Sequence, residues 1–318
     1  MEEVLELKHI CYAYHTLEGE TPTLTDISFA LKKGEFVAIV GPSGCGKSTL
    51  LSIIAGLLSP ERGLIKINGK YQRESTTNVG YMLQHDELFE WRSIYNNVIL
   101  GLEVQHMLTA RTREKAYELL DVYGLKSFAR SRPSELSGGM RQRVMIAMAL
   151  ACSPGLIIAD EPTTALDVTI QAQILDLLKE LKDKINSSIM LITHDLGVIA
   201  SMADYVVVMY AGRVVEKGTT EDIFHNPCHP YTIGLMKSKP VVGKKVDALY
   251  NIPGSVPNPV NMPDYCYFRD RCEQCVEKCQ GVYPPEIRVS DTHVVSCWRY
   301  DGQGEVVRWP KSVNVEEL

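Results

Sequence analysis

The chain has 318 residues, a length that accommodates about two domains. Its 33 lysines and arginines are outnumbered by 39 aspartates and glutamates, and the net charge of -6 excludes a chain-wide basic surface for binding nucleic acid. Apolar residues make up 45% and charged residues 23%, as in ordinary globular proteins, so disordered, collagen-like and coiled-coil chains are excluded.

The first 230 or so residues alternate strand-like and helix-like segments, which predicts an α/β fold with a largely parallel sheet. Apolar runs predict buried strands over 35–40, 156–159, 188–192 and 205–209, and a helix over 47–58. Between 84 and 136 the pattern is helical, with an amphipathic run over 113–123. We therefore expect a helical subdomain inserted between sheet elements.

The prolines at 240, 253, 257, 259 and 263 forbid a regular helix and predict an extended connector. The expected organisation is a first domain over 1–236 with its helical insertion at about 84–136, a Pro-rich linker over 237–264, and a Cys-rich C-terminal extension over 265–318, a second, small domain.

The longest apolar stretch, from Val144 to Cys152, is shorter than the roughly 20 residues that a membrane helix needs. Acidic residues at Glu2 and Glu3 stand where a secretory signal would carry basic ones. We expect a cytosolic chain with reduced thiols, in which clustered cysteines are candidate metal ligands.

Residues 41–48, with the sequence GPSGCGKS, match GxxxxGK[ST] between an expected strand and an expected helix. The glycines let backbone N–H groups turn toward phosphate oxygens, while Lys47 reaches the β- and γ-phosphates and Ser48 binds Mg²⁺. A glycine-rich turn with a chance lysine fits the bare pattern, but the flanking elements favour nucleoside triphosphate binding. The expected contacts are Gly41, Ser43, Gly44, Cys45, Gly46, Lys47, Ser48 and Thr49.

Asp160 and Glu161 close the apolar strand 156–159, at the edge of the sheet where ligands bind in open α/β folds. We expect Asp160 to hold Mg²⁺ and Glu161 to polarise the water that attacks the γ-phosphate. A solvated acidic turn is the alternative, which the neighbouring strand and Pro162 disfavour.

Residues 136–143, with the sequence LSGGMRQR, resemble the LSGGQ-type signature of the ABC ATPases, and the resemblance extends over about residues 4–235. It implies a P-loop NTPase fold of the ABC ATPase type and ATP hydrolysis. In this family's order, the chain carries counterparts of the Q-loop glutamine, the D-loop aspartate, the switch histidine and the aromatic that stacks on adenine: Gln84, Asp167, His194 and Tyr14.

By this resemblance, Gln84 binds Mg²⁺ and assists catalysis, and His194 donates a hydrogen bond to the γ-phosphate. Ser137, Gly138 and Gly139 would open a helix whose free N–H groups suit a γ-phosphate. The alternatives are a simple helix cap at Ser137, a surface glutamine and a histidine satisfied at a strand end. Tyr12 competes with Tyr14, because both rings lie on one expected strand.

ABC ATPases of this type act as head-to-tail dimers, in which the P-loop of one subunit faces the signature helix of the other. The resemblance implies a second ABC ATPase subunit, the same or paralogous, two transmembrane permease subunits that dock on the helical insertion, and an extracytoplasmic substrate-binding protein. The chain would be peripheral at the cytoplasmic face of the cell membrane, with no nucleic acid partner.

Two groups of importers compete for the substrate. Residues 88–93 and 97–98 resemble importers of nitrate, sulfonates or taurine. The segments 145–150, 160–169, 226–232 and 252–257 resemble the importers of oligopeptides, dipeptides or nickel, which we favour. A soluble ABC ATPase of DNA repair or translation is disfavoured, because the chain has neither a long coiled coil between its motifs nor two cassettes.

Five cysteines gather in a short polar segment that cannot build a substantial core alone. Four thiolates satisfy either Zn²⁺ or a [4Fe-4S] cluster, and their spacing does not separate the two. The resemblance favours iron–sulfur with Cys266, Cys272, Cys279 and Cys297 as ligands, and Cys275 as the extra thiol. Reduced, unliganded thiols are the alternative. We expect Cys45 and Cys152 to be small buried residues.

Overall fold

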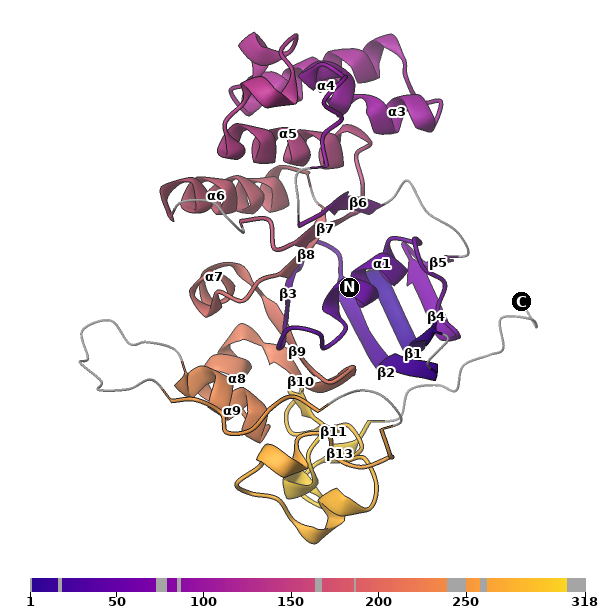
Figure 1. Cartoon of the computed structure of the whole chain (residues 1–318), viewed down its shortest axis with the longest axis vertical. Coiled ribbons are helices and arrows are strands. Elements are labelled where there is room, and N and C mark those ends of the chain that lie inside the picture. Colours follow the sequence, from indigo (N-terminus) through magenta and orange to yellow (C-terminus); the bar gives the residue numbers. More distant parts are fainter. Residues whose placement is uncertain are drawn as a thin grey trace.

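The computed structural model describes residues 2–16, 19–72, 79–84, 87–163, 168–185, 187–238, 250–257 and 262–307. Figure 1 shows a central sheet that runs the length of the molecule, with helices above and beside it and a second sheet on one side. In the described ranges, no helix is both long enough and apolar enough to span a membrane.

The main sheet has the strand order β13-β11-β12-β10-β9-β3-β8-β7-β6. Strands β9, β3, β8, β7 and β6 run parallel to their neighbours, and β10 turns back antiparallel to β9. The strands are β3 (Phe36–Val40), β6 (Val79–Met82), β7 (Leu156–Asp160), β8 (Ser188–Ile192), β9 (Tyr205–Tyr210), β10 (Arg213–Thr219), β11 (Ile287–Arg288), β12 (Val294–Val295) and β13 (Glu305–Val306). The four strands predicted from apolar runs are confirmed.

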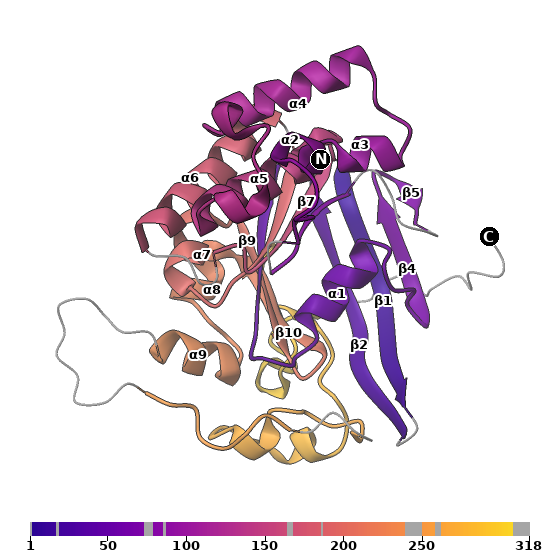
Figure 2. The ribbon, with the colours of Figure 1, turned by 45° about the horizontal axis from the view of Figure 1, so that its top comes forward.

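The second sheet is antiparallel, in the order β2-β1-β4-β5. Its strands are β1 (Glu3–Thr16), β2 (Gly19–Lys32), β4 (Arg62–Ile67) and β5 (Lys70–Tyr71). Helix α1 (Lys47–Ile54) lies between this sheet and the main sheet in Figure 2. Its buried leucines and isoleucines share one apolar core with residues of both sheets. The helix ends before the predicted residue 58, because Gly56 takes a left-handed φ of 75° just after it.

The helical insertion lies between β6 and β7, at the top of Figure 1. It contains α2 (Ile94–Val98), α3 (Leu100–Val104), α4 (Ala110–Val122), two short 3-10 helices (Lys126–Phe128 and Pro133–Glu135) and α5 (Gly138–Ala151). Helix α4 includes the predicted amphipathic run except its last residue, Tyr123, which caps the helix. It starts earlier than predicted, because the side chain of Thr109 caps it by accepting a hydrogen bond from the backbone N–H of Thr112.

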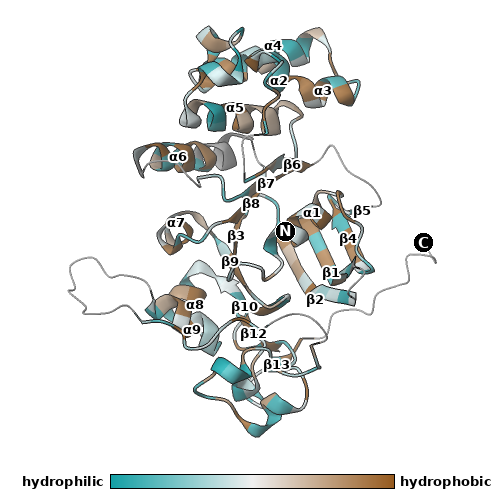
Figure 3. Cartoon of the chain, viewed as in Figure 1, coloured by the Kyte–Doolittle hydropathy of each residue, from teal (hydrophilic) through white to brown (hydrophobic). Residues whose placement is uncertain are grey.

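The remaining helices are α6 (Val168–Ile185), α7 (Leu196–Met202), α8 (Thr220–His225) and α9 (Pro230–Lys237). The central strands β3, β8 and β9 are hydrophobic in Figure 3, as expected of strands that are covered on both faces. Val37 and Ile39 of β3 face the core around α1, whereas Ala38 and Val40 face the core beneath α8 and α9. Each strand thus serves two cores.

The Cys-rich extension continues the main sheet and does not form the separate small domain that the proline pattern suggested. Strand β12 pairs antiparallel with β10, and three short 3-10 helices follow or precede it: Arg269–Arg271, Glu277–Gln280 and Trp298–Tyr300. Cys266, Phe268 and Cys279 share one apolar core with Val40 and Val208 of the central strands. The extension is too small to bury these residues alone, so it uses the core of the larger sheet.

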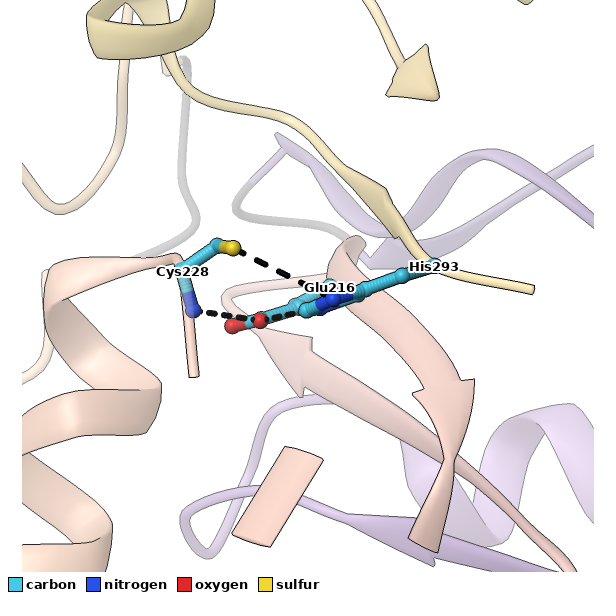
Figure 4. Close-up of side chains that lie close together, drawn as sticks. All are labelled: Glu216, Cys228 and His293. Atoms are coloured by element: carbon cyan, nitrogen blue, oxygen red, sulfur yellow. Dashed lines mark hydrogen bonds and ion pairs between the residues drawn. The ribbon is translucent and has the colours of Figure 1, made fainter. Parts of the chain in front are cut away.

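A buried ion pair fastens the extension to β10 (Figure 4). Nε2 of His293, just before β12, lies 2.7 Å from Oε1 of Glu216 on β10, and their side chains are 4% and 0% exposed. The same carboxylate accepts hydrogen bonds from the backbone N–H groups of Cys228 and His229, with nitrogen–oxygen distances of 2.6 and 2.8 Å. The Cys228 thiol lies 4.0 Å from Nδ1 of His293. Three segments therefore meet at one carboxylate.

The next residue of β10 makes a second buried contact with the extension. The ammonium of Lys217 lies 2.6 Å from Oε1 of Glu286 and donates to the carbonyl oxygen of Ser28 on β2 at 2.7 Å. Burial lowers the pKa of Lys217, and the charge of Glu286 opposes that shift. Because consecutive strand residues point to opposite faces, Glu216 and Lys217 hold the extension from both sides of β10.

We expect the replacement His293→Gln to lower the free energy of unfolding by about 3–5 kcal/mol at neutral pH, because it leaves the buried Glu216 carboxylate without its cation. Burial lowers the pKa of His293, but hydrogen bonds to Cys228 and Glu216 and the Glu216 charge raise it further, from 6.5 to about 10. The pair therefore stabilises the fold fully below about pH 6.5, and this stabilisation is lost as the pH rises through about 10.

Chemical denaturation of both proteins across this pH range measures the difference. The difference in unfolding free energy between the original protein and His293→Gln should decrease as the pH rises. His225→Gln, a change at an exposed histidine, should have little effect on the unfolding free energy at any pH. A difference that does not vary with pH would show that His293 is not protonated in the folded protein.

Candidate functional site

The glycine-rich loop joins β3 to α1, as predicted. Gly44 and Gly46 take left-handed φ values of 77° and 97°. A Cβ on Gly41 would lie 2.4 Å from the carbonyl oxygen of Met209, so the loop rests directly on the backbone of β9. The ammonium of Lys47 donates to the carbonyl oxygens of Gly41 and Pro42, at 2.9 and 3.0 Å. The loop thus closes around the lysine, at the N-terminus of α1.

Ser48 and Asp160 meet beside this loop. Asp160 ends β7 with 6% of its surface exposed. Burial raises the pKa of its carboxyl group, and a hydrogen bond with the Ser48 side chain opposes that shift. Hydroxyl and carboxylate oxygens are the ligands that Mg²⁺ prefers, so the donors present here fit that ion.

Three further predicted residues converge at the same edge of the sheet. The Oε2 atom of Glu161 lies 3.5 Å from the amide nitrogen of Gln84, and its Oε1 atom lies 3.8 Å from Nδ1 of His194. Glu161 has a positive φ of 47°, and its backbone N–H donates to the carbonyl oxygen of Ile192 at 2.9 Å. A strained backbone that its neighbours hold in place is common at functional sites.

A cavity of about 540 Å³ opens beside these residues. Its lining includes Lys47, Glu161 and His194. It also includes residues from the C-terminal region: Tyr231 of α9, Ile252 of the Pro-rich segment and Arg271 of the extension. The segments 226–232 and 252–257, which contain Tyr231 and Ile252, resemble the oligopeptide importers, but neither they nor Arg271 indicated a place beside the phosphate loop.

Tyr14 lies beside the start of α1. Its hydroxyl group is 3.4 Å from Oγ1 of Thr49, and its ring is 43% exposed. The Tyr12 ring meets it edge-on, with 5.0 Å between centroids, and packs partly into the core. Of the two rings, Tyr14 therefore offers the more accessible face next to the phosphate loop.

The signature residues lie away from the P-loop of their own chain. Ser137 caps α5, and its hydroxyl group accepts from the backbone N–H of Met140 at 3.4 Å. Gly139 packs against Ile170 of α6, where a Cβ would lie 2.6 Å from Cγ2. Figures 1 and 2 both place α5 among the helices of the insertion, apart from α1. The predicted D-loop residue Asp167 lies outside the described residues.

The five cysteines of the extension differ in their burial. Cys275 is exposed, Cys272 is partly buried, and the other three are buried: Cys266, Cys279 and Cys297. Burial raises the pKa of Cys266 to about 12 and that of Cys297 to about 11, and the neighbouring thiols contribute to both shifts. Elsewhere, Cys45 is buried as expected, whereas Cys152 is only partly buried.

Two family models match the chain. The model described as ABC transporter matches residues 24–164, which include the P-loop, the signature and Asp160-Glu161. The model described as Oligopeptide/dipeptide transporter, C-terminal region, matches residues 215–279. The second match covers most of β10 and the first four cysteines of the extension.

Similar proteins span almost the whole chain. The oligopeptide transport ATP-binding protein AppD of Bacillus subtilis is 41% identical over 96% of this chain and 99% of the relative. The oligopeptide transport ATP-binding protein OppD of Escherichia coli is 39% identical over 90% of each chain.

Solved structures share the fold of the first domain. A dimeric post-hydrolysis state of the ATP-binding cassette MJ0796 bound to ADP and Pi is 32% identical, with a TM-score of 0.62, and the match covers 68% of this chain and 98% of that one. The cbiO1 protein of Clostridium perfringens, part of the ABC transporter complex cbiONQ, is 30% identical, with a TM-score of 0.64 over 71% of this chain and 92% of that one. The chain therefore belongs to the ABC transporter family, as an ATP-hydrolysing, ATP-binding protein with the C-terminal region of the oligopeptide/dipeptide transporters.

Proposed function

We propose that this chain is the ATP-hydrolysing subunit of an importer of oligopeptides or dipeptides. The observation that carries the proposal is the meeting of Lys47, Glu161 and His194 around one cavity at the carboxyl edge of the sheet. Phosphoryl transfer depends mainly on positioning and on charge stabilisation, and these residues supply both.

Each residue has a distinct role in this proposal. Lys47 and the loop N–H groups bind the β- and γ-phosphates of ATP, and His194 donates a hydrogen bond to the γ-phosphate. Ser48, Asp160 and Gln84 would hold Mg²⁺, which neutralises the charge on the phosphates when it is bound. Glu161 accepts a hydrogen bond from the attacking water and takes up its proton.

A second ABC ATPase subunit, the same or paralogous, completes the site. Ser137, Gly138 and Gly139 open α5, whose free N–H groups and dipole suit a γ-phosphate. Helix α5 lies in the helical insertion, apart from α1, the helix that follows the P-loop (Figure 1). We infer that each chain contributes its P-loop to one nucleotide and its signature helix to another, with Asp167 also at that interface.

The partners in the membrane are two permease subunits, supplied with solute by an extracytoplasmic binding protein. The helical insertion offers exposed aromatic side chains a few residues after Gln84 in the sequence: Trp91 is 71% exposed and Phe89 is 37% exposed. Exposed apolar groups of this kind favour a protein interface. We propose that this surface docks on the permease at the cytoplasmic face of the membrane.

The cargo follows from the relatives. The match to AppD covers 96% of this chain and therefore includes the half in which residues 88–93 suggested importers of nitrate, sulfonates or taurine. The C-terminal match has the same oligopeptide/dipeptide description. Both observations favour peptides over those anions, over nickel, and over a soluble role in repair or translation.

We also propose that Cys266, Cys272, Cys279 and Cys297 hold a [4Fe-4S] cluster. Burial raises the pKa of Cys266, and the charges of Cys279, Cys297 and Cys272 all contribute to that shift, so the four thiols lie near one another, as the ligands of one metal site must. Four thiolates suit either Zn²⁺ or a [4Fe-4S] cluster. The resemblance of the cysteine spacing to that of the oligopeptide/dipeptide importers favours the cluster.

We expect Glu161→Gln to bind ATP but to hydrolyse it at least about 100-fold more slowly, because the carboxylate that accepts the water proton is gone. Phosphate release measures turnover, and size-exclusion chromatography with Mg-ATP should show that a closed dimer accumulates. Lys47→Ala should instead lose nucleotide binding. Undiminished turnover in Glu161→Gln would remove this residue from the role of base.

Replacing Tyr14 should test the adenine contact. Stacking of a base on an aromatic ring contributes about 1–3 kcal/mol, so Tyr14→Ala should weaken ATP binding about fivefold or more. Tyr14→Phe keeps the ring and loses only the hydroxyl contact with Thr49, so its affinity should stay close to that of the original protein. Fluorescence titration with a labelled ATP distinguishes these outcomes. Unchanged affinity in Tyr14→Ala would place the adenine elsewhere.

The metal proposal predicts about four iron atoms per chain and a visible absorption band in protein purified without oxygen. Cys279→Ser should lose both, because it removes a buried ligand. Cys275→Ser should keep both, because its thiol is exposed and outside the ligand set. Stoichiometric zinc without iron, or equal loss in the two variants, would contradict the assignment.

A further inference from the structure

Arg271 connects the Cys-rich extension to the rest of the molecule through three hydrogen bonds. Its Nε and Nη2 atoms donate to the backbone carbonyl oxygens of Pro253 and Ile252, at 2.8 and 3.0 Å. Its Nη1 atom donates to the Tyr210 hydroxyl group at 3.2 Å. One guanidinium thus holds the Pro-rich segment and the end of β9 at the same time. Cys272 follows it directly.

Tyr210 is fully buried at the end of β9, the strand that supports the P-loop. Its ring packs against Tyr231 and Phe268, with centroids 4.9 and 5.2 Å apart. The preceding residue, Met209, supplies the carbonyl oxygen that a Cβ on Gly41 would strike. No space therefore separates the end of β9 from the first residue of the P-loop.

The turn that follows Tyr210 also bonds to the P-loop. The backbone N–H of Gly212 donates to the carbonyl oxygen of Cys45 at 3.1 Å, and the carbonyl oxygen of Gly212 accepts from Thr25 at 2.8 Å. The non-glycine residue Ala211 has a positive φ of 46°, a conformation that its surroundings must hold. A shift of Tyr210 would therefore move both Gly41 and Cys45.

Arg271 also shapes the cavity on the phosphate side. Ile252, which it holds by the carbonyl group, lines the cavity together with Arg271, Lys47 and His194. Gly254 turns the Pro-rich segment with a φ of 76°, and a Cβ there would lie 3.3 Å from Cγ of Arg271. This wall of the cavity is thus built on the arginine side chain.

We propose that Arg271 is a positioning residue of the ATP site, through which the Cys-rich extension sets the affinity for nucleotide. It fixes the β9–β10 turn on which the P-loop rests, and it fixes part of the lining of the cavity that Lys47 also lines. The inference rests on the proposed nucleotide site. The hydrogen bonds are charge-assisted, and those to Tyr210 and Ile252 are partly buried, so water does not replace these two at equal free energy.

The test compares variants of the full chain that differ in this connection alone. Tyr210→Phe removes one hydroxyl group and keeps the ring packing. Arg271→Gln removes the guanidinium. Arg269→Gln is the matched control, because Arg269 lies in the same 3-10 helix but stacks on Tyr265, with 3.5 Å from the guanidinium carbon to the ring centroid. Labelled-ATP titration gives Kd, phosphate release gives KM and kcat, and thermal unfolding reports the fold.

We expect Arg271→Gln to raise the Kd and KM for Mg-ATP about fivefold or more, a typical size for coupling between sites, with a smaller change in kcat. Tyr210→Phe should shift both in the same direction, and the double variant should be no worse than Arg271→Gln, since both changes break one connection. Arg269→Gln should bind like the original protein.

Two results would overturn the proposal. One is unchanged Kd in a Tyr210→Phe protein that unfolds at the original temperature, and the other is additive effects of Tyr210→Phe and Arg271→Gln. If Lys47→Ala still binds ATP normally, the nucleotide site itself is wrong. That outcome is separate from a failure of Arg271 alone.

Discussion

The parallel pairing of β3 with its neighbours is the constraint on which the rest of this protein depends. Ile39 of β3 lies opposite Ile192 of β8, and Val40 lies opposite Val208 of β9. Because parallel strands end at one edge, the residues that follow them gather there without any contact between the loops themselves. A slip of one residue would exchange the side chains that β3 presents to its two cores and would shift Lys47 relative to Glu161.

Strand β10 extends this constraint to the C-terminal region. It turns back from β9 next to the P-loop, and its other edge pairs with β12. The extension is therefore attached to β10, whose neighbour β9 supports the P-loop. Glu216 and Lys217 place two buried ion pairs on this edge. Such pairs are costly to break, because either partner alone would be left as a buried charge. The extension is therefore part of the ATPase fold.

The sequence predicted most of this architecture because its signals are local. The strand at 36–40, the glycine loop and the helix from Lys47 form one continuous pattern, and apolar runs predicted the other central strands. The same patterns could not reveal the pairing of β12 with β10, because two-residue strands carry no periodicity. They could not reveal the pairing of Glu216 with His293 either, since each is an ordinary polar residue until the fold brings them together.

The separation of the P-loop from Ser137 has a consequence for how ATP can be used. A single chain presents Lys47, Glu161 and His194 to a cavity that has no signature residue in its wall. In the dimer proposed above, the donors at the start of α5 act on a γ-phosphate across the interface, so the nucleotide itself becomes part of what joins the two subunits. ATP then shifts the equilibrium toward the closed dimer by the difference between its affinities for the closed and the open state. Loss of the γ-phosphate removes that difference. Because Arg271 and Ile252 belong to the cavity on this same phosphate side, the extension lies where it can influence closure as well as affinity.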